Sequence, residues 1–233
     1  MSEELRWLDR TSVEIPAYLL ETYWWAYVHP RAVRIFERQW LVNAILWGNF
    51  GRLRDTALAG FGSDLQGRTL QVACVYGDLT EKLSSRIPAG GELDVVDVLQ
   101  VQVDNLKRKL PADTEVRIGL GNSSSLDAGS GTYDRAILFF LLHEQPEAVR
   151  RETLAEAVRV VKPGGRIVIV DYHRPAVLNP LRWLMVPLLA RLEPYALDLW
   201  RHELSEWLPS CACVVSKTTY FGGLYQRVVI ELQ

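Results

Sequence analysis

Residues 154–171 read LAEAVRVVKPGGRIVIVD, and this stretch decides the fold. Its first part closes a helix expected over residues 146–161, the KPGG tetrapeptide at residues 162–165 predicts a turn, and residues 166–170 predict a fully apolar strand. A helix that passes through a glycine turn into a strand is the repeating unit of an α/β protein.

The same alternation extends upstream of this stretch. Four further strands and two further helices are expected there, the strands at residues 69–75, 93–98, 115–120 and 135–141 and the helices at residues 78–86 and 99–110. Strands that alternate with helices indicate βαβ units with right-handed crossovers. The sequence therefore predicts an α/β, Rossmann-like fold with a mostly parallel sheet and helices on both faces.

The two flanks of this unit follow other patterns. Residues 212–219 and 225–232 are β-prone runs joined by a glycine pair, which predicts a hairpin and an antiparallel C-terminal strand at the sheet edge. Residues 1–62 carry apolar residues at helical spacing and predict an N-terminal helical cap. Residues 63–233 then form the core, with an apolar helical insertion at about residues 177–207, in one domain overall.

The composition is that of a folded globular protein. Of the 233 residues, 48% are hydrophobic and 23% are charged, and the net charge is -2, which argues against a disordered chain and against a nucleic-acid partner. Cys74, Cys211 and Cys213 lack the spacing of a disulfide framework and fit a reducing compartment. The first ten residues are charged and lack the apolar core of a signal peptide, so we expect a cytoplasmic location.

Aromatic and apolar residues gather in two segments. Residues 18–47 contain four of the eight tryptophans, and residues 177–200 form the most apolar stretch of the chain. Both segments suit core packing, and both suit a surface that leans on a bilayer, because amphipathic aromatic side chains favour either setting. Prolines and arginines interrupt the second segment and exclude an ordinary membrane span. The region around Trp183 and Trp200 is the candidate bilayer surface.

Ligands of an open α/β sheet bind beyond the carboxyl ends of the strands, where the strand order reverses. The first strand leads to Gly77, a residue suited to the tight turn that brings backbone amides toward a cofactor. The second strand ends at Asp97, whose carboxylate can bind both ribose hydroxyls of an adenosine or can cap the next helix. The order of these two features favours the ribose role.

With these features, residues 69–170 resemble the class I S-adenosylmethionine methyltransferases. TLQVACVYGDLT resembles their first motif, Asp97 the acidic end of their second strand, and YDRAILFFLLHE followed by LAEAVRVVKPGGRIVIVD their fourth and fifth strands. The adenine edge would contact Asn122 and Ser123, although NSSS is also prone to form a turn. The resemblance implies an S-adenosylmethionine site to which nine residues contribute, namely Gln71, Cys74, Tyr76, Gly77, Asp97, Val98, Asn122, Ser123 and Phe139.

The first motif departs from this class at three positions. Gln71 stands where the class has an acidic residue that helps to hold the methionine amine, and Ala73 and Val75 replace two further glycines. These departures indicate that the donor binds differently or gives up a different group.

The flanking segments sharpen the resemblance. IPAYLLETYWWAYVHPRAVRIFERQWLVNAILWGNF, VACVYGDLT and TYFGGLYQRVVI closely resemble the rhodoquinone-biosynthesis enzymes, which are related to the quinone C-methylating group and convert ubiquinone to rhodoquinone. The resemblance implies that an amino group replaces a ring methoxy group of ubiquinone, with S-adenosylmethionine as amino donor and a divalent metal, manganese (Mn2+), assisting. Because a polyprenyl quinone partitions into the bilayer, we also expect peripheral attachment to the inner face of the bacterial inner membrane.

Polar residues near the strand ends are the candidates for the chemistry. His143, Tyr76 and Asp78 are the expected catalytic residues. His143, Asp171 and His173 offer the imidazole and carboxylate ligands that manganese accepts. His143 could act instead as the base that takes a proton from the incoming amine. Capping and loop polarity remain the alternatives for Asp171.

A physical argument makes amino transfer plausible. A quinone carbon that bears methoxy is electrophilic, because it is the β-carbon of a conjugated carbonyl, so an amine held beside it can add and methanol can leave. A metal on the carbonyl oxygen would act as a Lewis acid. An amine held by a carboxylate stays an ammonium ion and is no nucleophile, so Gln71 fits this chemistry and the change Gln71→Asp is expected to impair it.

Two other functions stay open. The first is an ordinary S-adenosylmethionine-dependent methyltransferase of a quinone or another small molecule. The second is a catalytically silent, methyltransferase-like scaffold for quinone-biosynthesis partners, which the altered first motif would suit. Product mass separates the two catalytic readings, and binding of partners without turnover would favour the scaffold.

Overall fold

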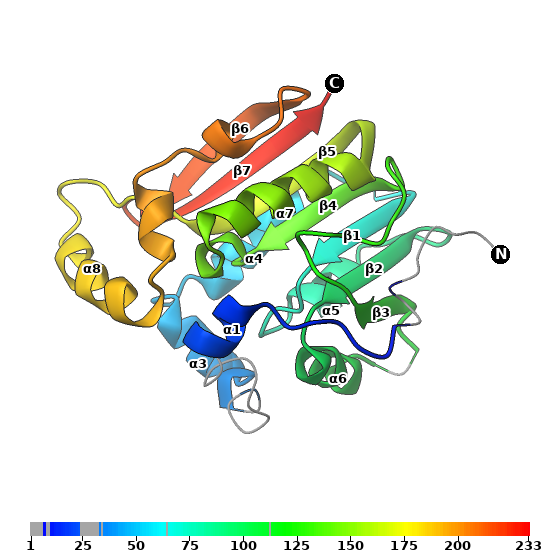
Figure 1. The fold of residues 1–233 in the computed structure, drawn as a ribbon, viewed down its shortest axis with the longest axis horizontal. Coiled ribbons are helices and arrows are strands. Elements are labelled where there is room, and N and C mark those ends of the chain that lie inside the picture. Colours follow the sequence, from blue (N-terminus) through cyan, green and yellow to red (C-terminus); the bar gives the residue numbers. More distant parts are fainter. Residues whose placement is uncertain (1–6, 8–9, 24–32, 34, 64, 112) are drawn as a thin grey trace.

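The central feature of the structure is a seven-stranded sheet in the order β3-β2-β1-β4-β5-β7-β6 (Figure 1). The computed structural model describes residues 7, 10–23, 33, 35–63, 65–111 and 113–233. β1 to β5 pair in parallel, and β7 pairs antiparallel with β5 and β6, which confirms the predicted mostly parallel sheet with its C-terminal hairpin. The strands are β1 (Arg68–Val72), β2 (Glu92–Asp97), β3 (Val116–Leu120), β4 (Tyr133–Phe139), β5 (Val161–Tyr172), β6 (Ala212–Tyr220) and β7 (Tyr225–Leu232).

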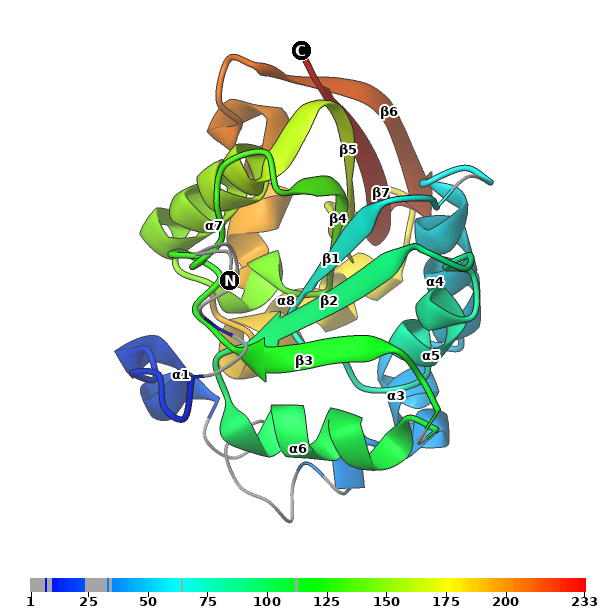
Figure 2. The same cartoon turned by 90° about the vertical axis from the view of Figure 1, so that its right-hand side faces the viewer.

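Helices cover both faces of the sheet, as predicted. α4 (Phe50–Ala59) and α5 (Leu79–Ser84) lie on one face and α7 (Glu147–Val160) on the other, and α6 (Gln100–Lys109) leads from β2 to β3 (Figure 2). A strand covered on both faces reads as a continuous apolar run rather than an alternating one. The residues from Ile167 to Val170 in β5 are accordingly almost fully buried.

The KPGG segment lies inside β5 rather than before it. Opposite β4, the pairing jumps from Val161 to Arg166, so the intervening residues form an irregularity in the strand. Gly164 has a φ of 75°, a conformation that glycine adopts without steric penalty. A Cβ atom on Gly165 would lie 2.7 Å from a backbone carbonyl oxygen of β4. The predicted turn is therefore a bulge whose glycines the backbone requires.

The N-terminal helices and the insertion meet beyond the carboxyl ends of the parallel strands. α1 (Ala17–Thr22) and α3 (Gln39–Ile45) come from the N-terminal segment, and α8 (Leu181–Leu192) with the short 3-10 helices η4 (Ala196–Trp200) and η5 (Leu204–Trp207) forms the insertion (Figure 1). α4 contacts β5 and β7, so this helix belongs to the layer that covers the sheet. Trp24 and Trp25 lie outside the described residues.

The two tryptophans of the predicted bilayer surface have opposite environments. Trp183 on α8 is 79% exposed, whereas Trp200 at the end of η4 is 9% exposed and belongs to the core. The prediction is therefore wrong for Trp200, because the short helix η4 turns its ring inward. Within the described ranges, no helix is long and apolar enough to cross a bilayer.

Candidate functional site

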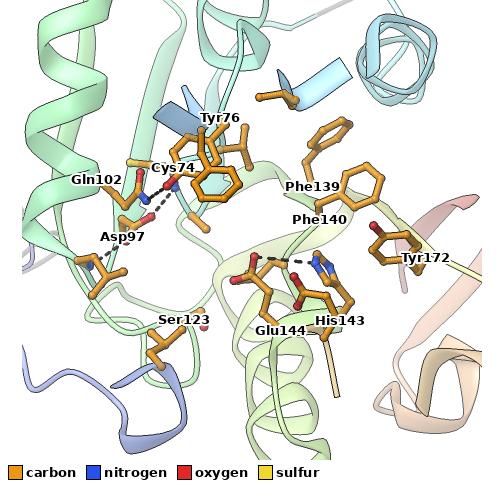
Figure 3. Close-up of a pocket in the computed structure, with 18 of the residues that line it drawn as sticks. Cys74, Tyr76, Asp97, Gln102, Ser123, Phe139, Phe140, His143, Glu144 and Tyr172 are labelled. Atoms are coloured by element: carbon orange, nitrogen blue, oxygen red, sulfur yellow. Dashed lines mark hydrogen bonds and ion pairs between the residues drawn. The ribbon is translucent and has the colours of Figure 1, made fainter. Parts of the chain in front are cut away.

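A cavity of about 410 Å³ lies at the carboxyl ends of the parallel strands, where sequence reasoning places the ligand. Loops that follow β1, β2, β3 and β4 line its inner part, and α1, α3 and α8 line its mouth. Figure 3 shows Asp97, Gln102 and Tyr76 on one side and His143, Glu144 and Tyr172 on the other, with the rings of Phe139 and Phe140 on this second side. The strand order reverses between β1 and β4, which opens the space between their loops.

Asp97 ties two loops together at one end of this cavity. Its carboxylate oxygens accept the backbone N–H of Cys74 at 2.7 Å and that of Leu99 at 2.8 Å. Burial raises the pKa of Asp97 to about 6, although the two backbone hydrogen bonds oppose the shift. Each carboxylate oxygen keeps a second acceptor site, so Asp97 has the geometry to bind hydroxyl groups in the cavity.

Two residues with left-handed backbone conformation flank the inner wall. Ala73 directly follows β1 with a φ of 74°, and Phe140 directly follows β4 with a φ of 53°. Each donates its backbone N–H to the strand alongside, to Val96 and Val170 respectively, and each lines the cavity. Non-glycine residues adopt this conformation at an energetic penalty, and such strain concentrates at functional sites.

Gln71 and Gly77 support the loop after β1 without reaching the cavity, which corrects their predicted contact with the cofactor. The buried amide of Gln71 donates to the carbonyl oxygen of Ala73 at 3.0 Å and accepts the hydroxyl of Thr80 at 3.0 Å. A carboxylate there could not donate to Ala73, so impaired activity of Gln71→Asp would not by itself identify amino transfer. Gly77 has a φ of 85°, and a Cβ atom on it would lie 2.5 Å from the ring of Phe50.

The remaining predicted cofactor residues do line the cavity. Cys74, Val98, Asn122, Ser123 and Phe139 all contribute to its wall. The side-chain oxygen of Asn122 also accepts the backbone N–H of the residue two positions on, at 3.0 Å, so the turn expected of NSSS is present as well. Ser123 accepts a hydrogen bond from the amide of a buried glutamine at 3.0 Å.

Tyr76 lines the cavity as a neutral phenol. Its hydroxyl accepts a hydrogen bond from the amide of Gln102 at 2.9 Å, and its ring stacks on Phe36 with the centroids 6.1 Å apart. Burial raises the pKa of Tyr76 well above its ordinary value. Tyr76 can therefore pack against a ring or donate a hydrogen bond, but it cannot supply a phenolate base near neutral pH.

Asp78, predicted as a catalytic residue, does not line the cavity. It precedes α5 and forms an ion pair with Arg54, whose Nη1 lies 2.7 Å from its Oδ1. Partial burial would raise the pKa of Asp78, but the hydrogen bond and the charge of Arg54 outweigh it and lower the pKa. Asp78 therefore joins α5 to α4.

His143 and Asp171 form a buried pair at the other end of the cavity. The Nδ1 of His143 lies 2.9 Å from an Asp171 carboxylate oxygen, and Asp171 also accepts the backbone N–H groups of Leu142 and Tyr172. Burial alone would lower the pKa of His143, but the Asp171 charge more than offsets it and raises the pKa to about 9. The imidazole is thus cationic near neutral pH, with Nδ1–H on Asp171 and Nε2–H available on its far side.

His173 lies apart from this pair, which corrects the predicted metal site. Its ring nitrogens lie 2.8 Å from the carbonyl oxygen of Gly223 and 3.1 Å from the amine of Lys217. Partial burial lowers the pKa of His173. Within the part of the chain that the structure describes, no three histidine, cysteine or acidic side chains gather to hold a metal ion. The residues predicted for manganese therefore do not come together as a site for it.

Two acidic residues of the cavity have no assigned role in the sequence prediction. Glu144 follows His143 and lies 3.9 Å from its Nε2, and Glu193 caps the C-terminal end of α8 and lines the same wall. Burial raises the pKa of Glu193, against the attraction of His143 and a hydrogen bond with Tyr23. Glu193 is the one acidic residue in the sequence between Asp171 and residue 198, and this isolation in an apolar segment is the signal that marks it.

The arrangement thus joins a polar end to an aromatic and cationic end. Asp97 and Asn122 stand at the first, and the second holds His143 between the rings of Phe140 and Tyr172, with centroid distances of 5.9 and 5.0 Å. A cationic N–H between aromatic rings can bind a flat ring that carries a partly negative oxygen. The fold and this cavity define a class I, Rossmann-like α/β protein with a two-part small-molecule site.

Comparison with known proteins shows which proteins this chain is similar to. Residues 69–165 match the sequence profile of a methyltransferase domain. An uncharacterized methyltransferase of Synechocystis sp. is 26% identical and covers 88% of this chain and 92% of its own length. A demethylmenaquinone methyltransferase of Lactiplantibacillus plantarum is 28% identical over 82% of this chain and 78% of its own length. A ubiquinone/menaquinone biosynthesis C-methyltransferase of Syntrophotalea carbinolica is 29% identical over 62% and 54%.

Solved structures show the same fold at low identity. The N-methyltransferase NodS of Bradyrhizobium japonicum, in complex with S-adenosyl-L-homocysteine, has a TM-score of 0.58 at 13% identity and covers 97% of this chain and 95% of its own. A SAM dependent methyltransferase of Aquifex aeolicus has a TM-score of 0.58 at 17% identity, over 88% and 99%. Residues 69–165 therefore resemble a methyltransferase domain, the chain shares the fold of S-adenosylmethionine-dependent methyltransferases, and its relatives include proteins named as quinone methyltransferases.

Proposed function

We propose that this protein transfers a group from S-adenosylmethionine to the ring of a prenylated quinone. The observation that carries the proposal is the continuity of one cavity from Asp97 to His143, with a mouth formed by apolar residues of α3 and α8. The names of the relatives point to a quinone as the substrate. Aromatic side chains line the inner end of the cavity, where a flat ring would fit.

The residues at the polar end fit S-adenosylmethionine. Asp97 would bind the ribose hydroxyls through its free acceptor sites, and Asn122 and Ser123 would face the adenine edge. Cys74 and Val98 would pack against the nucleoside. The bound sulfonium compound supplies an activated methyl group and an amine beside the second substrate. The chain's contribution is to hold both molecules in one water-poor cavity.

At the other end, His143 would stabilise negative charge on a quinone oxygen. Its Nδ1–H is fixed by Asp171, and Nε2 forms an ion pair with Glu144 at 3.9 Å, which is beyond hydrogen-bond distance, so Nε2–H is the donor that a substrate oxygen would meet. Because the pKa of His143 is raised to about 9, the imidazole carries a proton and a charge when the substrate arrives. A preorganised cationic donor of this kind favours a phenolate or an enolate oxygen.

Two groups can be transferred, and they demand opposite redox states of the ring. The relatives named as quinone methyltransferases favour the methyl group. Methyl transfer forms a ring carbon–carbon bond and needs an electron-rich quinol, whose phenolate His143 would hold. In methyl transfer, the product gains one methyl group and the ring loses a proton.

A specific observation favours amino transfer as the second candidate. Gln71 replaces the acidic residue of the first motif, and its amide points into the loop after β1 instead of into the cavity, so the carboxylate that would hold the donor's amine as ammonium is missing from this site. Amino transfer needs the oxidised quinone, because the amine adds to an electron-poor carbon and methoxide leaves as methanol. The quinone ring would then take up the two electrons of the donor's Cα–H bond and become a quinol, and water would hydrolyse the resulting imine, which releases the aminoquinol and the donor's α-keto acid. With ubiquinone as substrate, the product is the quinol form of rhodoquinone.

Doubly labelled S-adenosylmethionine tests the proposal. We would supply it with a carbon-13 methyl group and a nitrogen-15 amine, together with a short-tailed quinone or quinol, with and without manganese, and weigh the products. Carbon-13 in a product made from quinol supports methyl transfer, and nitrogen-15 in a product made from quinone supports amino transfer. Folded protein that makes neither product would contradict both and favour the scaffold. We also propose that the protein is cytoplasmic and attaches to the inner face of the bacterial membrane.

A further inference from the structure

α8 is an apolar helix that the chain covers on one side only. Ten residues of its sequence LRWLMVPLLARL are apolar, and two, Met185 and Leu189, are buried. Trp183 is 79% exposed, and Leu178, just before the helix, is 95% exposed. A helix that is apolar all round is normally buried in a core or a membrane. The exposed apolar side of α8 would therefore be stabilised by contact with an apolar medium outside the chain.

The exposed residues of α8 continue onto α3 around the mouth of the cavity. Trp40 on α3 is 66% exposed, and Ile45 and Trp47 are exposed beside it. Ile45, Leu188 and Leu192 are exposed and also line the cavity, so the outer surface and the cavity share one apolar wall. We define the apolar rim as the exposed residues of these two segments, Trp40, Ile45, Trp47, Leu178, Trp183, Leu184, Leu188 and Leu192.

The charge on the same two segments is of one sign. Residues 38–53 contain two arginines and no acidic residue, and residues 172–192 contain three arginines and no acidic residue, whereas Arg54 is ion-paired with Asp78. The whole chain has a net charge of -2, so these segments oppose the rest of the protein. Arginine beside exposed tryptophan and leucine is the composition of a surface that binds anionic lipid.

We propose that the apolar rim inserts into the surface of an anionic bilayer and opens the cavity toward the acyl chains. A second copy of the chain is a poor occupant, because a symmetric contact through the rim would bring like-charged arginines together. The rim would let a lipid-soluble substrate reach His143 without crossing water. The identity of that substrate rests on the proposed function, but the lipid contact does not.

Vesicle binding tests the inference directly. We would compare vesicles of pure phosphatidylcholine with vesicles that contain phosphatidylglycerol, using sedimentation and the tryptophan emission of the full-length protein. The triple variant Trp40→Ser, Trp183→Ser, Leu184→Ser changes rim residues that do not line the cavity, and Val215→Ser changes an equally apolar, 48% exposed residue on β6. We expect the triple variant to bind anionic vesicles at least about tenfold more weakly and Val215→Ser to bind as the unchanged protein does.

A single charge variant gives a second readout that does not depend on the triple variant folding. Arg191→Gln removes an exposed arginine and should weaken binding to anionic vesicles, with no effect on neutral ones. Equal binding to both vesicle types by the unchanged protein would overturn the inference. So would a rim-dependent dimer, seen by light scattering, in a protein that ignores vesicles.

Turnover separates failure of this inference from failure of the proposed function. The triple variant should lose at least about tenfold in turnover of a long-tailed quinone in anionic vesicles and keep the turnover of a short-tailed quinone in solution. Rim-dependent vesicle binding without any turnover would contradict the proposed function and leave the lipid contact standing. Turnover of both quinones in a protein that binds no vesicles would overturn the lipid contact and leave the function standing.

Discussion

Two buried carboxylates mark the two ends of the cavity, and the chain uses them differently. Asp97 accepts two backbone N–H groups and forms no ion pair with any residue that the structure describes, and burial raises its pKa to about 6. Asp171 accepts backbone N–H groups as well, but it also holds the imidazole of His143. The first carboxylate shapes a loop and stays open to a ligand, whereas the second fixes a positive charge in the wall. The role of a carboxylate at a strand end therefore depends on which groups the neighbouring loop places beside it.

The largest expected effect comes from removing the second carboxylate. Asp171→Asn leaves His143 buried without its counter-charge, so turnover should fall on the order of 100-fold and the free energy of unfolding by about 3 kcal/mol. Steady-state kinetics and denaturant unfolding measure the two quantities. Asp97→Asn is the matched control, because it should weaken binding of S-adenosylmethionine while the ionisation of His143 stays in place. Near-normal turnover in Asp171→Asn would show that the charge pair of Asp171 and His143 does not contribute to catalysis.

The charge on His143 predicts the pH dependence. Its pKa rises from an ordinary 6.5 to about 9 on folding, so the protonated form is stabilised in the folded protein. The contribution to stability, about 3 kcal/mol, is complete below pH 6.5 and is lost as the pH rises through 9. Turnover should fall over the same alkaline range. If turnover does not change from pH 7 to 10, or if its alkaline fall persists in His143→Gln, then the imidazole of His143 is uncharged or takes no part in the reaction.

Changing Glu193 tests the end of the cavity that holds His143, with a smaller expected effect. Its negative charge adds to that of Asp171 in raising the pKa of His143. Glu193→Gln should therefore move the alkaline limb of the activity profile to lower pH, with a loss of less than about tenfold at pH 8. Stability should stay level or improve, because burial already penalises this carboxylate. Glu147→Gln, an exposed change on α7, should leave the limb in place, and equal shifts in both variants would rule out the local effect.

The sequence predicted the sheet better than it predicted the site. Periodicity located the strands and the hairpin, because apolar runs and glycine turns are local signals. Asp97 and His143 line the cavity because they follow strands whose ends meet there. Asp78 and His173 do not line it, because residues near a strand end can point either way, and Asp78 bonds to Arg54 and His173 to Lys217.

Glu193 was missed for a related reason. It sits beyond the sheet, at the end of α8, and no strand-end rule brings it to the cavity. The contact depends on how the insertion folds back over the strand ends, which is a long-range packing event without a local signal. The same packing hides Trp200 and exposes Trp183.

The smallest expected effect returns to the loop that Asp97 holds. Ala73 has a φ of 74°, where a side chain costs about 1 kcal/mol, and glycine would remove that strain while adding some freedom to the unfolded chain. Ala73→Gly should therefore change the free energy of unfolding by less than about 1 kcal/mol, in the stabilising direction. Ala155→Gly, an exposed change in the middle of α7, should destabilise by about 0.5–1 kcal/mol, so the two variants differ in sign. Chemical denaturation of both proteins measures the difference. If Ala73→Gly destabilises as much as Ala155→Gly, the left-handed backbone at Ala73 is not strained.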